Sequence, residues 1–143
     1  MIINIINKST NPLPEYATEG SAGVDIRADL QEDIILDSLD RFLIPTGIFV
    51  EIPEGYEIQI RARSGLSIKK GLTLVNAVGT IDSDYRGEIM VPIINLSKEK
   101  AVISHGERVA QMILAKYERI EFKEAEELKD TQRGDGGFGH TGL

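Results

Sequence analysis

The sequence predicts an all-β protein, a barrel or jelly roll that carries one short helix. Its apolar segments are short and regularly spaced, and Gly, Pro, Asn and Asp separate them. That spacing is typical of closed or nearly closed β architectures. Residues 56–63 alternate apolar and polar side chains, with the two-residue period of a half-buried strand.

Further strands are predicted along the chain at residues 34–36, 42–44, 48–52 and 88–96. The last of these is nearly continuous in apolar residues, as a strand buried on both faces would be. It contains Pro92, which cannot donate a hydrogen bond to a neighbouring strand. We therefore expect that strand at a sheet edge, or with a bulge.

Two segments have helical features. Residues 64–71 begin with Ser64, a residue type that caps helices, and end with Gly71, which suits a helix of one or two turns. Residues 108–129 are ambiguous, because several apolar side chains there also fit helical spacing. We interpret them as containing a strand through Met112 and Ile113, because the rest of the chain is so β-like.

Composition limits the function. The chain has 143 residues, no internal repeat and no linker, so we expect one domain over residues 1–143. A net charge of −7 argues against sequence-independent nucleic-acid binding, and no apolar run reaches the roughly 20 residues that span a bilayer. The absence of cysteine excludes disulfides and is compatible with a cytoplasmic location.

Three internal segments contain candidate ligand-binding groups. Arg63-Ser64-Gly65 follows a strand and opens the predicted helix, where backbone N–H groups attract anions. A helix cap beside a surface arginine explains that tripeptide equally simply and is favoured on its own. Asp82 and Asp84 offer a base for water or ligands for a cation, or else the two side chains of an Asx-turn.

Arg108 and Gln111 lie three residues apart, so in a regular strand they fall on opposite faces and do not bind one atom together. For Arg108 an ordinary salt bridge is at least as good an interpretation as a ligand contact. The segment 133–142 contains five glycines and one aromatic residue, and it cannot build a core alone. It is either a disordered terminus or a flap that orders over a ligand.

Taken in order, five segments resemble the sequence motifs of the trimeric dUTPase family, over nearly the whole chain. They are Ala22-Gly-Val-Asp-Ile-Arg-Ala28, Arg63-Ser-Gly-Leu-Ser67, the stretch from Asn76 through Gly79-Thr-Ile-Asp-Ser-Asp-Tyr-Arg-Gly87, Arg108-Val-Ala-Gln-Met112, and the tail from Arg133 to Gly142. Five spaced motifs are far more specific than any one of them. The resemblance implies a jelly-roll-like distorted β-barrel that hydrolyses dUTP to dUMP and pyrophosphate and so contributes to dUMP biosynthesis.

The resemblance also implies roles for single residues. Asp82 matches the general base that activates water for in-line attack on the α-phosphorus, and Tyr85 matches the aromatic residue that excludes a 2′-hydroxyl. The uracil slot would be lined by Asn76, Gly79, Thr80, Ile81 and Met90, with Phe138 stacked on the base. The phosphate-binding positions would be Arg63, Ser64, Gly65, Gln111, Arg133, Gly139, His140 and Thr141.

The family resemblance implies a cofactor and an assembly as well. Mg²⁺ would be held mainly by the triphosphate, with Asp25 near it through water. The chain would form a homotrimer whose sites are shared between subunits, and residues 130–143 would be a flexible C-terminal flap over a neighbour's site. The alternatives are an enzyme like dCTP deaminase, or a non-catalytic nucleotide-binding trimer. Tyr85 and the Phe138 tail favour phosphohydrolysis over deamination, and Asp82 with the arginines argues against a pure binding module.

Overall fold

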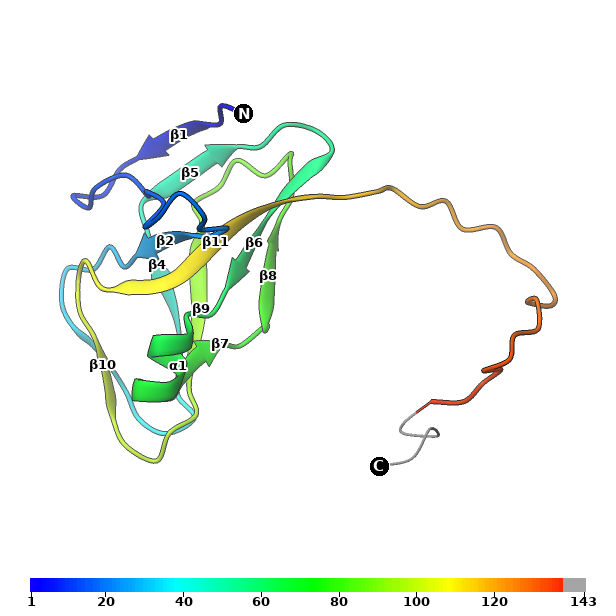
Figure 1. The fold of residues 1–143 in the computed structure, drawn as a ribbon. Helices are drawn as coiled ribbons and strands as arrows, with labels where there is room; N and C mark the ends of the chain where they lie inside the picture. The colour runs from blue at the N-terminus through cyan, green and yellow to red at the C-terminus, as the bar shows by residue number, and fades with distance from the viewer. Residues whose placement is uncertain (138–143) are drawn as a thin grey trace.

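The computed structural model describes residues 1–137, which contain strands β1 to β11 and one helix, α1 (Figure 1). In chain order they are β1 (Asn4–Asn7), β2 (Val24–Arg27), β3 (Ile34–Leu36), β4 (Arg41–Pro45), β5 (Ile48–Glu51), β6 (Tyr56–Arg61), α1 (Ser64–Lys70), β7 (Leu72–Leu74), β8 (Val78–Ile81), β9 (Met90–Asn95), β10 (Ala101–Ile103) and β11 (Arg108–Lys116). The predicted all-β class with one short helix is therefore confirmed.

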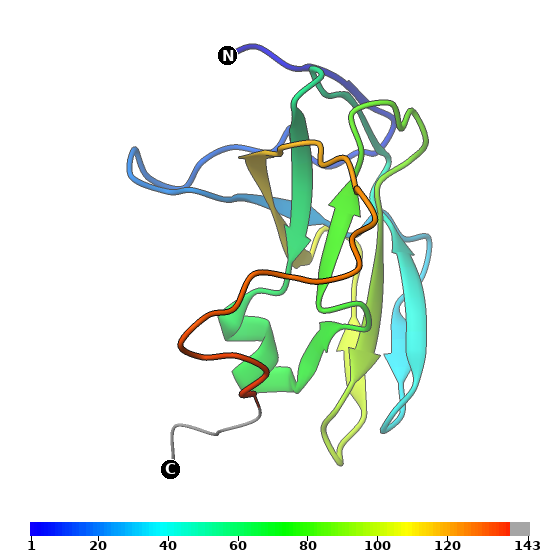
Figure 2. The ribbon, with the colours of Figure 1, turned by 90° about the vertical axis from the view of Figure 1, so that its right-hand side faces the viewer.

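The strands form four small antiparallel sheets. The largest has the order β2-β11-β6-β8, a second has the order β4-β9-β7, and two pairs, β1-β5 and β10-β3, complete the set. The described residues thus make several packed sheets and not one continuous closed barrel. Figure 2 shows β6 and β8 side by side, with α1 below them.

Branched aliphatic side chains fill the space between the sheets. Ile26, Ile44, Leu72, Ile89, Ile93 and Ile103 are fully buried. In β6, Ile58 and Ile60 point into this core while Arg61 is exposed, so the predicted alternation is confirmed. Each such side chain contributes about 1.5–3 kcal/mol when it leaves water.

The expectation that Pro92 places its strand at an edge or in a bulge is wrong. Strand β9 is the central strand of its sheet, and Pro92 pairs with Leu43 in an unbroken register. On the other side, pairing with β7 ends at Leu74, and Val75 donates its N–H to the Pro92 carbonyl. In an antiparallel strand the N–H and C=O of one residue point to the same side. The N–H that Pro92 lacks would therefore point toward Val75, beyond the end of β7, where no strand hydrogen bond is required.

Helix α1 has the predicted extent but a different start. Its N-cap is Arg63, which makes no capping hydrogen bond through its side chain, so Ser64 is the first helical residue and not the cap. At the other end Gly71 has φ of 66°, and a Cβ there would lie 2.6 Å from the Ser97 Cβ. Glycine is therefore required at Gly71 both by the left-handed backbone and by the neighbouring chain segment.

The first part of the ambiguous segment 108–129 forms strand β11, as the strand interpretation predicts, and residues 117–129 contain neither helix nor strand. Its register against β2 shifts between Arg108 and Ala110, which marks a β-bulge. Val109 and Ala110 are consequently both buried, so Arg108 and Gln111 emerge on the same face of the sheet. The expectation of opposite faces is wrong because the extra residue of a bulge reverses the alternation beyond it.

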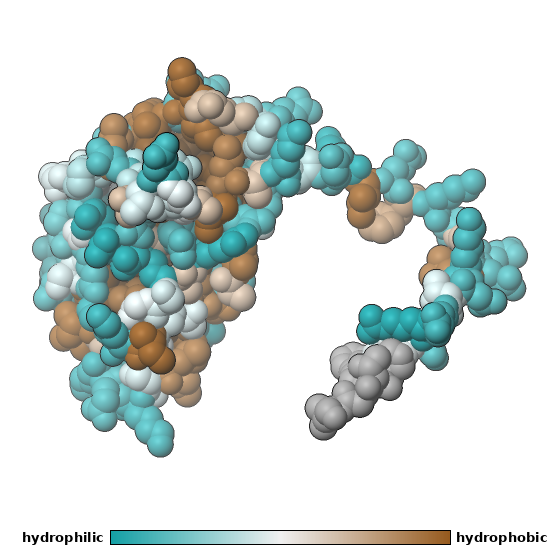
Figure 3. Space-filling model, viewed as in Figure 1, coloured by the Kyte–Doolittle hydropathy of each residue, from teal (hydrophilic) through white to brown (hydrophobic). Residues whose placement is uncertain are grey.

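After β11 the chain leads away from the sheets, and residues 118–137 contain no helix or strand (Figure 1). This segment is mostly hydrophilic, with a few apolar side chains among the polar ones (Figure 3). Ile120, Phe122 and Leu128 are 72%, 88% and 90% exposed. No helix within residues 1–137 has the length and apolar character needed to cross a membrane.

Candidate active site

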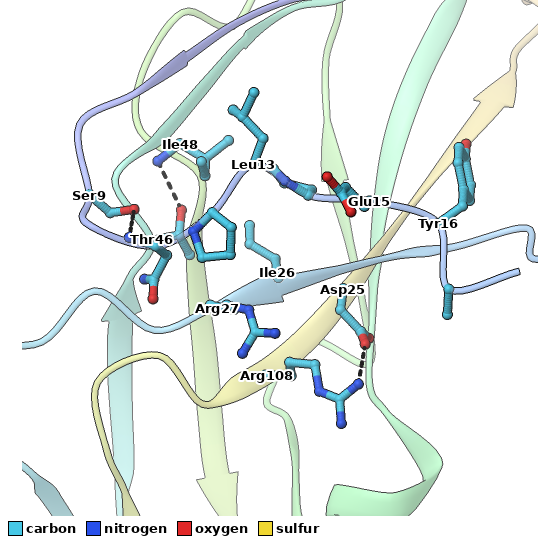
Figure 4. A pocket seen from close by; sticks show the side chains of 14 residues that line it. Ser9, Leu13, Glu15, Tyr16, Asp25, Ile26, Arg27, Thr46, Ile48 and Arg108 are labelled. Carbon is cyan, nitrogen blue, oxygen red and sulfur yellow. Dashed lines mark hydrogen bonds and ion pairs between the residues drawn. The ribbon is translucent and has the colours of Figure 1, made fainter.

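The first group of candidate residues surrounds the carboxylate of Asp25 on β2. Arg63 Nε lies 2.7 Å from Asp25 Oδ1. Arg108 Nη1 lies 3.2 Å from Asp25 Oδ2 (Figure 4). The two guanidinium groups therefore share one carboxylate, and about a quarter of the Arg63 and Asp25 side-chain surfaces is exposed. Arg108 therefore makes a salt bridge, one of its two interpretations from the sequence, and the two arginines and one aspartate together carry a net positive charge.

Gln111 belongs to the same group. It pairs with Asp25 across the sheet, and opposite residues of paired strands project to the same face. Its side-chain amide donates to the Ala62 carbonyl at 3.0 Å. Ser64 and Gly65 stand at the start of α1, where backbone N–H groups have no partner within the helix. Donor groups from β11, α1 and Arg63 thus gather at one place.

The second group lies on the segment from Asn76 to Met90, which contains β8 and leads to the start of β9. Asn76 is in the tight turn before β8, next to Ala77, whose φ is 61°. Gly79, Thr80 and Ile81 belong to β8, and Met90 begins β9. A Cβ at Gly79 would lie 3.2 Å from the Asn76 amide nitrogen, so the glycine allows the amide side chain to lie close against the strand.

Asp82 and Tyr85 follow β8 in an exposed turn, in which the Tyr85 N–H donates to the Asp82 carbonyl at 3.2 Å. The carboxylates of Asp82 and Asp84 accept no hydrogen bond from residues 1–137, which rules out the Asx-turn alternative there. Both carboxylates line an open hollow together with Arg86 and Tyr117. Within the described part of the chain, nothing competes with water for the Asp82 carboxylate.

The two groups lie at opposite ends of β6. Arg63 lies two residues after Arg61, the last residue of β6. At the other end, β6 and β8 last pair at Ile58↔Ile81, so the next residue, Asp82, lies opposite Glu57. From 57 to 63 is six residues, which at about 3.3 Å per residue gives a separation of roughly 20 Å. Within one chain the structure brings Asp25, Arg63 and Gln111 together and keeps Asp82 away from them.

The tail residues are only partly described. Arg133 is exposed, and its Nε donates to the Gly136 carbonyl at 2.8 Å within a local turn. Phe138, Gly139, His140 and Thr141 lie outside the described residues.

Three residues near these groups have no role in the sequence interpretation. Arg27 shares a face with Asp25 and donates to the Gly106 carbonyl at 2.6 Å, and the two-residue spacing in a strand is a signal that predicts this neighbourhood. Hydrogen bonds from Thr46 to Glu88 and Ile89 join the turn after β4 to the end of the segment 76–90. Nothing in the sequence around Glu88 distinguishes it from a surface carboxylate.

The chain is similar to known proteins over nearly its whole length. The family model described as dUTPase matches residues 9–142. The deoxyuridine 5'-triphosphate nucleotidohydrolase of Finegoldia magna is 66% identical, with 99% of each chain covered, and that of Fusobacterium nucleatum is 56% identical, with 98% of this chain and 96% of the relative covered. Among solved structures, the dUTPase of Staphylococcus bacteriophage 80alpha with dUPNHPP has a TM-score of 0.85 at 27% identity, with 99% of each chain covered.

Proposed function

We propose a residue-level mechanism for this chain, which belongs to the dUTPase family and hydrolyses dUTP to dUMP and pyrophosphate. The high identity to two nucleotidohydrolases sets aside both the deaminase and the non-catalytic binding module. In this mechanism the group around Asp25 binds the phosphates, and the segment 76–90 around Asp82 supplies the base and selects the nucleoside.

The group around Asp25 binds the triphosphate. Arg63 offers a planar guanidinium suited to phosphate oxygens, and Asp25 holds it in place at 2.7 Å. Ser64, Gly65 and Gln111 add donors beside it. Several fixed donors directed at one anion stabilise the charge that moves onto the leaving pyrophosphate during the reaction.

Asp82 acts as the general base. Its carboxylate takes a proton from a water molecule, the water oxygen bonds to the α-phosphorus, and the bond from that phosphorus to the bridging oxygen of the β-phosphate breaks. Pyrophosphate leaves with the electron pair, and dUMP remains. The exposed carboxylate without a partner in residues 1–137 supports this assignment, and a well-placed base contributes about 10²–10⁴-fold to the rate.

The segment 76–90 around Asp82 selects the nucleoside. Tyr85 lies three residues after the base, and its ring would pack against the sugar where a 2′-hydroxyl needs space. Asn76, Met90 and the strand from Gly79 to Ile81 would line the uracil slot. A slot built with hydrogen-bonding groups rejects bases that leave those groups unpaired.

The separation along β6 is the observation that carries this proposal. A backbone separation of roughly 20 Å is longer than a triphosphate, whose phosphorus atoms are joined through single oxygens, and we infer that Arg63 and Asp82 of one chain act on different nucleotides. Each site is therefore completed by another copy of the chain. A homotrimer with three shared sites follows the closed symmetry that most homo-oligomers adopt.

Magnesium fits the first group only when the substrate is present. Residues 1–137 contain no cluster of three or more His, Cys, Asp or Glu side chains that could hold a metal alone. Mg²⁺ commonly uses one or two carboxylates together with substrate phosphates, and Asp25 would contact it through water. When bound, the ion would neutralise phosphate charge.

We assign the C-terminal tail to closure of the active site. Residues 130–143 would form a flap over a neighbouring site, in which Arg133 contacts the γ-phosphate and Phe138 stacks on the uracil, while Gly139, His140 and Thr141 close over the phosphates. The exposed segment that leads away from β11 supports this reach. A cytoplasmic location completes the proposal, and a chain without cysteine is compatible with it.

Subunit mixing tests the shared site. Asp82→Asn chains and Arg63→Ala chains are refolded separately and in an equal mixture, and pyrophosphate release from dUTP is measured. If a site takes Asp82 from one chain and Arg63 from the next, three quarters of the trimers are mixed and each has one intact site, giving roughly a quarter of wild-type activity. A mixture no more active than its parents would place the whole site in one chain.

A further inference from the structure

The turn between β4 and β5 binds the side chain of Glu88, three residues after Tyr85, the proposed sugar-selecting residue. The backbone N–H groups of Thr46 and Gly47 both donate to Glu88 Oε1, at 2.9 Å and 2.8 Å. The acceptor is an ionisable side chain, so these bonds are stronger than neutral ones when it is charged. One carboxylate oxygen thus joins two segments that are about 40 residues apart in sequence.

The residue after Glu88 is fixed by the same turn. The Thr46 hydroxyl donates to the Ile89 carbonyl at 2.5 Å. It also accepts the Ile48 N–H at 3.2 Å (Figure 4). The Ile89 N–H donates to the Ile48 carbonyl at 2.8 Å. Thr46 and Ile89 are 1% and 0% exposed, so water does not compete for these bonds.

The turn itself has little freedom. Gly47 has φ of 68°, and a Cβ there would lie 2.7 Å from the backbone nitrogen of Ser9. Its carbonyl accepts the Lys8 N–H at 2.8 Å. The position of Glu88 is therefore fixed by a rigid part of the fold.

Tyr85 contacts the Glu88 backbone directly. Its hydroxyl donates to the Glu88 carbonyl at 3.0 Å. A Cβ at Gly87 would clash with the same hydroxyl oxygen, so the ring lies across the glycine. Because Tyr85 is 44% exposed, its orientation depends on this backbone contact more than on enclosure by a core.

We propose that Glu88 is a positioning residue for discrimination between deoxyribose and ribose: its carboxylate, bound by the Thr46–Gly47 turn, fixes the carbonyl that orients the Tyr85 ring. The inference rests on the proposed role of Tyr85 as the sugar gate. Glu88 itself need not touch the nucleotide.

The experiment compares kcat/KM for dUTP with kcat/KM for UTP. Glu88→Ala removes the acceptor and is expected to lower this ratio roughly tenfold, because a ring displaced by a fraction of an ångström admits the 2′-hydroxyl. Glu88→Gln keeps an oxygen acceptor and should restore most of the ratio. Gly87→Ala moves the ring while leaving Glu88 intact, so it should also relax discrimination. Glu99→Ala, a carboxylate removed from an exposed loop, is the matched control and should change nothing.

A second readout does not depend on what Tyr85 does. The chain has four tyrosines, so 3-fluorotyrosine gives four ¹⁹F signals, and Tyr85→Phe identifies the one from Tyr85. Glu88→Ala should shift or broaden that signal alone, and Glu99→Ala should not.

The outcomes distinguish the positioning role of Glu88 from the sugar-gate role of Tyr85. If a folded Glu88→Ala protein keeps both the wild-type ratio and the wild-type Tyr85 signal, the positioning role is refuted, whatever Tyr85→Ala does. If the signal moves but Tyr85→Ala still rejects UTP, Glu88 orients a ring that is not the gate, and the sugar-gate assignment fails while the structural contact stands.

Discussion

Gln111 on β11 occupies the space that a side chain at residue 23 would fill. A Cβ added to Gly23 would lie 2.6 Å from Gln111 Oε1. The other end of the same amide donates to the Ala62 carbonyl at 3.0 Å, so the amide is held from two directions. The glycine of the first motif therefore sets the orientation of the glutamine of the fourth.

Gly23→Ala should weaken phosphate binding without unfolding the protein. The backbone at Gly23 is not in the left-handed region, and the clash is with the far end of a flexible side chain, so Gln111 is displaced at little cost in stability. We expect kcat/KM for dUTP to fall roughly tenfold, as for loss of one charge-assisted hydrogen bond. Thermal unfolding should be nearly unchanged. Wild-type kinetics would show that the amide does not act on the triphosphate.

Asp82→Asn should separate binding from chemistry. The amide keeps the size of the carboxylate but cannot accept a proton from water, so kcat should fall by roughly a hundredfold or more. The affinity for a non-hydrolysable dUTP analogue, measured by calorimetry, should stay within a few-fold of wild type. Asp84→Asn is the control two residues away, and equal losses in both variants would contradict the assignment of the base.

Tyr85→Ala should open the site to ribonucleotides. Without the ring the 2′-hydroxyl has room, so turnover of UTP should rise relative to dUTP by about tenfold or more. Pyrophosphate release from each nucleotide gives the comparison. Rejection of UTP at the wild-type level would show that another surface excludes the hydroxyl.

Truncation after Gln132 should leave a folded, assembled protein with poor catalysis. Residues 133–137, the described part of the removed segment, contribute no side chain to the buried core, so thermal stability and trimer mass should be retained. Loss of closure should lower kcat/KM by roughly ten- to a hundredfold. Full activity in the truncated protein would dismiss the flap.

Much of the fold can be predicted because side-chain alternation follows directly from strand geometry. The pattern over β6 predicts which side chains point inward, and Gly71 correctly predicts the end of α1. Pro92 misleads because its effect depends on the length of β7, a neighbouring strand that local sequence does not specify. The bulge in β11 is likewise decided by pairing with β2, so the shared face of Arg108 and Gln111 cannot be read from their spacing.

The candidate site, like the fold, can be predicted from the sequence only in part. Family resemblance predicts which residue types matter, yet each motif taken alone is compatible with an ordinary cap, turn or salt bridge. That Arg63 and Asp82 lie at opposite ends of one strand follows only from the β6–β8 register. Glu88 is missed because its importance comes from a turn distant in sequence, and no local pattern records that contact.

In the proposed shared site, the placement of Arg63 and Asp82 at opposite ends of β6 also makes specific activity depend on how much of the protein is assembled. If each site is shared between chains as proposed, a single chain with Arg63 at one end of β6 and Asp82 at the other contains two half-sites and no complete site. Specific activity should therefore depend on enzyme concentration, falling steeply once dilution passes the point at which chains dissociate. In a cell that synthesises this protein slowly, activity would rise as a high power of the chain concentration, because newly made chains are inactive until they assemble.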